Sequence, residues 1–88
     1  MSYQIIIARG AQKDMAGLHP DVRADVDKHI LALGDDPRPP GVVSLKGKRR
    51  GYLRVRAGEH RIIYAVDDKT QTVAVVAVGP RGTVYKRL

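Results

Sequence analysis

Two short runs of alternating apolar and polar residues flank a turn near the middle of the chain, within residues 51–64. Successive side chains of a strand point to opposite faces of a sheet, so Leu53 and Val55 are expected to share one face. Residues 57–60 predict a hairpin turn, in which Gly58 is free to adopt a positive φ. The return strand then places Ile62 and Val66 on the same core face, which makes the segment a β-hairpin.

The polar positions of this hairpin are mostly arginines. Arg54, Arg56 and Arg61 all fall on the face that is expected to point outward, away from the core. Tyr52 falls on the same face, as a ring beside the charges on which a base can stack. The pattern therefore predicts a cationic sheet surface.

The remaining strands are predicted from apolar runs. Residues 3–8 are apolar and β-branched, which is typical of a buried strand. Residues 42–45 form a brief apolar segment. Residues 73–78 are apolar at every position, which indicates a central strand with both faces covered. Gly79 and Pro80 are expected to end that strand.

Two helices are predicted between the first strand and the hairpin. Residues 11–18 contain good helix formers, and Gly17 is expected to end this short helix. Apolar residues then recur at helical spacing, which predicts a longer helix over Pro20–Leu33, with proline at its first position. Gly34 is expected to lie just beyond its end.

This order of elements predicts an α+β domain. It comprises an N-terminal strand, an antiparallel helical hairpin and a mainly antiparallel sheet of three further strands, with the helices on one face of the sheet. The chain has 88 residues, so we expect a single domain over residues 1–88.

The charge of the chain narrows the choice of partner. The formal net charge is +7 and the sequence pI is about 10.2, which favours nucleic acid or an acidic protein as partner. Within residues 46–61 Glu59 is the one acid, whereas a surface built only for solubility mixes both signs. From this segment we predict the following RNA-binding residues: Lys46, Lys48, Arg49, Arg50, Tyr52 and Arg56.

Several other kinds of site are not expected. The chain has no cysteine and its three histidines are scattered, so we expect no metal and no cofactor. We find no glycine-rich phosphate loop and no serine in a nucleophile elbow. No apolar run approaches a membrane span and no signal peptide precedes the first strand, so the expected location is the cytoplasm, without a membrane partner.

Arginine and tyrosine remain as the groups that can do chemistry. RNA cleavage by attack of the adjacent 2′-OH needs no metal, but it needs a proton acceptor, a proton donor and stabilisation of charge on the phosphorus centre. Guanidinium groups match phosphate oxygens bidentately. Arg54, Arg61, Arg81 and Tyr85 can be assembled for this purpose, because strands that end at Gly79 and begin at Arg61 can lie side by side. The alternative is a phosphate-binding surface without catalysis.

The sequence resembles the RelE/ParE toxin superfamily of type II toxin–antitoxin systems over nearly its whole length. The resemblance is strongest in Leu45-Lys-Gly47, in Tyr52-Leu-Arg-Val-Arg-Ala-Gly-Glu-His-Arg-Ile-Ile-Tyr64 and in Val78-Gly-Pro-Arg-Gly-Thr-Val-Tyr85. It implies an α+β fold like that of microbial ribonucleases, and neutralisation by a cognate antitoxin, which we expect to be acidic. RelE-type members cut mRNA in the ribosomal A site, whereas ParE-type members inhibit DNA gyrase.

The resemblance also implies roles for particular residues. Arg61 matches the arginine that holds the scissile phosphate, and Arg81 matches the arginine that stabilises the transition state or leaving group. Tyr85 matches the tyrosine that stacks on or orients the substrate base. Arg54 stands where RelE has a lysine implicated as general base. Arginine is a poor base, so either Tyr85 or water takes that role, or turnover is slow. Tyr52 stands where RelE has a second lysine.

These observations favour a ribosome-dependent mRNA endoribonuclease. Retention of Arg61, Arg81 and Tyr85 together supports this interpretation over the two alternatives. The first alternative is a ParE-like inhibitor of DNA gyrase. The second is a module that binds RNA or antitoxin without catalysis.

Overall fold

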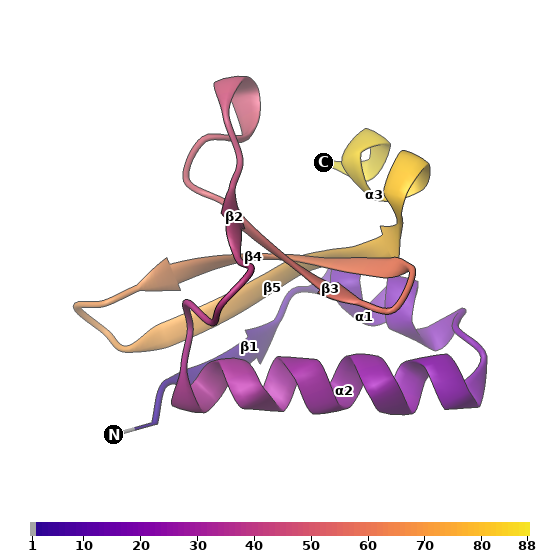
Figure 1. Ribbon diagram of the computed structural model, residues 1–88, viewed down its shortest axis with the longest axis horizontal. Helices are drawn as coiled ribbons and strands as arrows, with labels where there is room; N and C mark the ends of the chain where they lie inside the picture. The colour runs from indigo at the N-terminus through magenta and orange to yellow at the C-terminus, as the bar shows by residue number, and fades with distance from the viewer. Residues whose placement is uncertain (1) are drawn as a thin grey trace.

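A five-stranded mixed sheet forms the centre of the computed structural model, which describes residues 2–88 (Figure 1). The elements in chain order are β1 Gln4–Ile7, α1 Arg9–Ala16, α2 Pro20–Asp35, β2 Val43–Ser44, the 3₁₀ helix η1 Gly47–Arg49, β3 Leu53–Ala57, β4 His60–Asp67, β5 Thr72–Pro80 and α3 Arg81–Arg87. The predicted α+β class is confirmed, but four strands and not three follow the helical hairpin, because the apolar segment at residues 42–45 contributes the short strand β2.

The strands lie in the order β1-β5-β4-β3-β2. β1 runs parallel to β5, and every other neighbouring pair is antiparallel. β5 therefore has a neighbour on each side, which confirms the central strand predicted from its continuous apolar run. Strands β3 and β4 form the predicted hairpin, and Gly58 at its turn has a φ of +63°.

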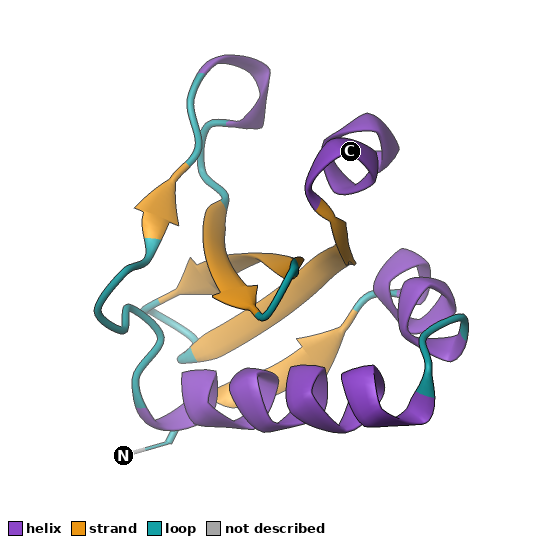
Figure 2. Ribbon diagram, turned by 45° about the vertical axis from the view of Figure 1, so that its right-hand side comes forward, coloured by secondary structure: helices purple, strands orange, loops and turns teal. Residues whose placement is uncertain are grey.

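The helices divide between the two faces of the sheet (Figures 1 and 2). α1 and α2 lie on one face, as predicted, whereas α3 and η1 rise from the other. None of the helices formed by residues 2–88 is long and apolar enough to span a bilayer.

The main core lies between the sheet and the first two helices. Val55, Ile62 and Tyr64 from the hairpin pack there against Val26 and Ile30 of α2. Leu53 and Val66 are partly buried against the same cluster. The predicted core face of the hairpin is therefore confirmed.

The opposite face of the sheet has a small core of its own, which the sequence pattern did not reveal. Ile63 and Ala77 are fully buried beneath Val84, the buried residue of α3. No element was predicted for the last residues of the chain, yet α3 begins directly after β5. The arginine face is therefore a partly covered surface and not the open one that we expected.

The end of α2 also differs from the prediction. Gly34 was expected just beyond the helix, but the helix continues through it to Asp35. The backbone amide of Tyr3 donates a hydrogen bond of 2.7 Å to the Gly34 carbonyl. A Cβ at Gly34 would lie 3.3 Å from the backbone carbonyl oxygen of Tyr3. Glycine at this position allows the close approach of the segment that leads into β1, instead of terminating the helix.

Tyr64 connects the main core to the segment that follows α2. The side chain is fully buried, and its hydroxyl donates a hydrogen bond of 2.7 Å to the Pro37 carbonyl. Burial raises the pKa of Tyr64 to about 12. The neutral phenol is therefore strongly favoured in the folded state.

Alkaline pH is expected to destabilise the fold through Tyr64. Because its pKa is higher in the folded chain than in the unfolded one, the stabilisation is complete below about pH 10 and is lost as the pH rises towards 12. The expected loss in the free energy of unfolding is about 1 kcal/mol by about pH 11 and about 3 kcal/mol once both states are ionised. Urea unfolding of the wild type and of Tyr64→Phe isolates this contribution, because the variant lacks the titrating group. Equal pH dependence of the two proteins would contradict the prediction.

Candidate functional site

A group of arginines lies where β3 and β4 pair. Arg54 and Arg56 come from β3 and Arg61 from β4, and Arg56 lies directly opposite Arg61 across the two strands. Like charges directly opposite one another destabilise a sheet. This pair therefore has an electrostatic cost, which a bound anion would lower.

Arg61 is the innermost of these residues. Its strand position puts it on the predicted face, but only 6% of it is exposed, so the expectation that it points freely outward is corrected. Burial lowers the pKa of the Arg61 guanidinium, and the charges of Arg56 and Arg54 lower that pKa further. Arginine nevertheless stays protonated in proteins. The site thus holds a permanent, poorly hydrated positive charge.

Tyr85 of α3 is fixed against this group by two arginines. Arg54 Nη1 donates a hydrogen bond of 2.9 Å to the Tyr85 hydroxyl oxygen. Arg49 Nη2 donates one of 2.8 Å to the Tyr85 carbonyl, and its Cζ lies 5.5 Å from the centroid of the tyrosine ring. Because the hydroxyl oxygen accepts from Arg54, its own proton can be directed towards another acceptor.

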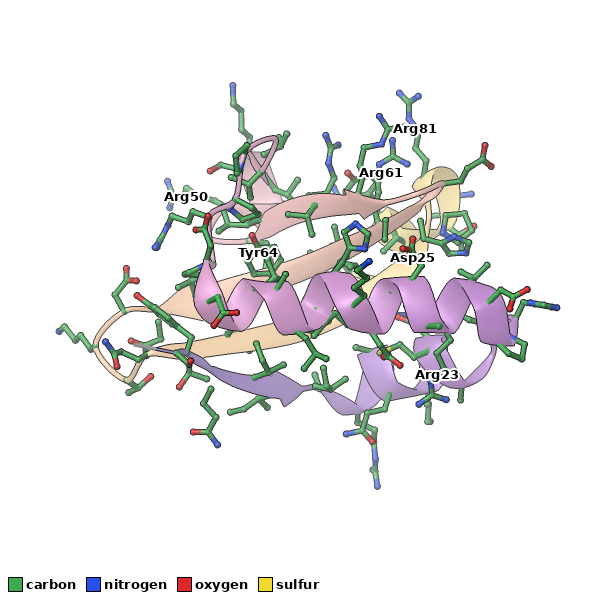
Figure 3. The ribbon with its side chains drawn as sticks, turned by 60° about the horizontal axis from the view of Figure 1, so that its bottom comes forward. Arg23, Asp25, Arg50, Arg61, Tyr64 and Arg81 are labelled. Carbon is green, nitrogen blue, oxygen red and sulfur yellow. The ribbon has the colours of Figure 1, made fainter. Side chains whose placement is uncertain are left out.

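Arg81 completes the site from the start of α3. It is exposed, and with Arg56 and Arg61 it lines an open hollow of about 370 Å³. Figure 3 shows Arg61 and Arg81 together at one end of the sheet. The pairing of Arg61 with Gly79 brings the two there, because β5 leads directly into α3.

Three guanidinium groups of this region have donors that are left over. In the described part of the chain, the Nε atoms of Arg49, Arg54 and Arg61 are buried and have no hydrogen-bond partner. Buried donors are nearly always paired in folded proteins. A phosphate oxygen is the strongest acceptor for such a donor. Of these three residues only Arg61 lines the hollow, together with Arg56, Arg81 and the acid Glu59, so the hollow carries an excess of positive charge and donors that suit a phosphate.

The other residues predicted for RNA binding lie at different distances from this hollow. Lys46 and Lys48 are exposed in and beside η1. Arg50 lines a separate hollow with Arg38, and Figure 3 shows it far from Arg61 and Arg81. Tyr52 is half-buried against the small core beneath α3, so its ring is already partly covered.

The positioning role of Arg49 was missed by the sequence reasoning. It was predicted as one of several loop cations that bind phosphate, but it is half-buried and joins η1 to α3. No periodicity marks it, because the contact spans 36 positions of the chain. A correct prediction of α3 would have indicated this role, because α3 provides the carbonyl that Arg49 binds.

Known proteins are similar to this chain over nearly its full length. A family model described as ParE toxin of type II toxin-antitoxin system, parDE, matches residues 5–85. Toxin RelG of Mycobacterium tuberculosis is 32% identical over 89 residues, which cover 99% of this chain and 100% of RelG.

Solved structures agree with this similarity. The toxin–antitoxin complex RelBE2 from Mycobacterium tuberculosis contains a chain with a TM-score of 0.83 and 26% identity, covering 92% of this chain and 100% of that chain. The archaeal RelE–RelB complex from Pyrococcus horikoshii contains a chain with a TM-score of 0.79 and 26% identity. The similarity covers 96% of this chain and 100% of that chain. The arrangement of sheet and helices is thus shared with both.

Proposed function

The chain belongs to the RelE/ParE superfamily of type II toxins, and from that membership we propose that it is a ribosome-dependent mRNA endoribonuclease that inhibits translation. One observation carries the proposal: the Tyr85 hydroxyl is hydrogen-bonded to Arg54 and lies beside the buried charge of Arg61. A surface that only binds phosphate needs the arginines. It does not need a phenol held among them.

The arrangement supports cleavage by the neighbouring 2′-OH. In this reaction the 2′ oxygen forms a bond to phosphorus while the bond to the 5′ oxygen breaks, which leaves a cyclic phosphate and a 5′-OH. Arg61 and Arg81 hold the phosphate and stabilise the negative charge that grows on its oxygens. Because Arg61 is buried on β4, its donor is in place before the phosphate binds and little reorganisation of that group is needed in the transition state.

Proton transfer falls to Tyr85 and water. Tyr85 donates its proton to the departing 5′ oxygen, and Arg54 stabilises the resulting negative oxygen through the hydrogen bond of 2.9 Å. Water accepts the proton of the 2′-OH, since arginine is too weak a base to do so. Arg54 therefore holds the Tyr85 hydroxyl and does not act as the general base.

Primer extension on cellular mRNA after induction tests this function. We expect new 5′ ends within translated regions, and their loss in an Arg61→Ala, Arg81→Ala double variant. The alternative is inhibition of DNA gyrase, which the ParE description of the matching family model favours. Full toxicity of the double variant, with uncut mRNA and accumulating DNA breaks, would replace the first function by the second.

A cognate antitoxin is the expected protein partner. The structural relatives from Mycobacterium tuberculosis and Pyrococcus horikoshii are chains of toxin–antitoxin complexes. A net charge of +7 favours rapid association with an acidic protein. We expect it to cover part of Arg54, Arg61 and Arg81, or to displace α3. Hydrogen exchange measured with and without the product of the adjacent reading frame tests this, and unchanged exchange in β4 and α3 of the complex would contradict it.

RNA binding is expected to weaken steeply with salt. Each phosphate neutralised on single-stranded RNA contributes roughly −0.7 to the slope of log affinity against log salt, so three contacts give a slope of about −2. Arg56→Ala should make the slope shallower by about 0.7. Arg23→Ala is the matched control, because Arg23 is exposed on α2 on the opposite face (Figure 3). A slope near zero would remove the arginine hollow from RNA binding.

A further inference from the structure

The carboxylate of Asp14 on α1 joins three elements of the fold. Its Oδ2 accepts a hydrogen bond of 3.0 Å from the Val78 amide of β5 and one of 2.7 Å from Arg87 Nε of α3. The Asp14 side chain is only 15% exposed. Arg87 also donates to the Val76 carbonyl through Nη2. The last turn of α3 is therefore fastened to α1 and β5 through a single guanidinium group.

Gly10 makes room for that guanidinium group. A Cβ at Gly10 would lie 3.0 Å from Arg87 Cζ and closer still to Nη1. Gly10 is the second residue of α1, and alanine is intrinsically the better helix former. Glycine here thus weakens its own helix and leaves space for the side chain of another.

The orientation of α3 depends on such contacts. With seven residues it is too short to be stable alone, and Val84 is its buried residue. Arg49 holds the Tyr85 carbonyl on the side of η1. Arg87 fastens the same C-terminal part of the helix to α1 and β5, so the helix that carries Arg81 and Tyr85 is held from two sides.

We propose that Arg87 is a positioning residue: its guanidinium, seated over Gly10 and bound to Asp14, sets the orientation in which α3 presents Tyr85 and Arg81 to the substrate phosphate. The proposal rests on the ribonuclease function proposed above. It assigns Arg87 no contact with RNA. Displacement of reacting groups by about 1 Å can lower a rate by about 10²-fold, so a distant fastening can control turnover.

Gly10→Ala fills the space that the Arg87 guanidinium occupies, without changing any charge. We measure single-turnover mRNA cleavage on programmed ribosomes, and amide exchange at Val78 and in α3 of the purified toxin. We expect the maximal cleavage rate to fall by about 10- to 100-fold. The toxin concentration that gives half of the maximal rate should change little. The amides of Val78 and α3 should exchange faster. Gly17→Ala is the control at the C-cap of α1: Gly17 has a φ of −86°, and its Cβ would meet only the Asp14 carbonyl oxygen at 3.7 Å.

Variants of Arg87 test the guanidinium itself. Arg87→Ala should reproduce the effect of Gly10→Ala, and Arg87→Lys should restore part of the rate, because lysine keeps the charge facing Asp14. Lys86→Ala removes an exposed cation from the same turn and should change neither measurement. Wild-type rates and exchange in both Gly10→Ala and Arg87→Ala would overturn the proposal. A wild-type toxin that cleaves no mRNA would instead refute the ribonuclease function, and exchange alone would then decide whether the fastening exists.

Discussion

Replacing Arg81 with alanine is expected to lower the rate of mRNA cleavage by about 10²–10³-fold, because one donor to the developing charge is lost. The fold should remain intact. Arg81 is exposed at the first position of α3, and surface substitutions of this kind usually change stability by less than about 0.5 kcal/mol.

The measurement is the maximal single-turnover rate on programmed ribosomes, together with the urea midpoint of the variant. Arg23→Ala provides the control, since it removes the same kind of side chain from an exposed position of α2 on the other face of the sheet. A rate within threefold of the wild type would exclude Arg81 from the transition state.

Replacing Tyr85 with phenylalanine is expected to lower the maximal rate by about 10²-fold, the lower end of the range for a positioned proton donor. The substitution keeps the ring and its contact with Arg49, whose Cζ lies 5.5 Å from the ring centroid. It removes only the hydroxyl group that Arg54 holds. Base stacking is therefore preserved while proton transfer is lost.

Two further variants make this result specific. Tyr3→Phe removes a hydroxyl at a different place, where it donates to Asp68, and should leave cleavage unchanged. Arg54→Lys should lower the rate, because lysine lacks the planar guanidinium that donates to the Tyr85 hydroxyl oxygen. A Tyr85→Phe rate near that of the wild type would reduce Tyr85 to a stacking platform and would return proton transfer to water alone.

Local patterns in the sequence predicted most of the fold. The hairpin, the central strand and the start of α2 at Pro20 follow from alternation, from an unbroken apolar run and from helix-start chemistry, all of which act over a few residues. Each of these elements also buries the face that its pattern assigns to the core. For this reason the arginines of β3 and β4 could be placed on one face without a structure.

The parts that were missed depend on contacts between distant residues. α3 contains Gly82 and one buried apolar residue, Val84, so it has no amphipathic pattern to detect. It is held where Ile63 and Ala77 lie beneath it, on strands that precede it. Gly34 resembles a helix terminator until the segment before β1 packs against it. The burial of Arg61 was missed for the same reason, because α3 covers this face of the sheet.

The late position of β5 in the chain also determines when the arginine surface can form during synthesis. β1 is made first, yet its partner, residues 72–80, follows both helices and every other strand. Contacts between positions so far apart in sequence form late and slowly. Arg61 obtains its neighbour on β5, and Arg81 its place on α3, only after that strand has been made. Under the proposed ribonuclease function, the catalytic groups of a nascent chain therefore come together only after β5 and α3 have left the ribosome and docked.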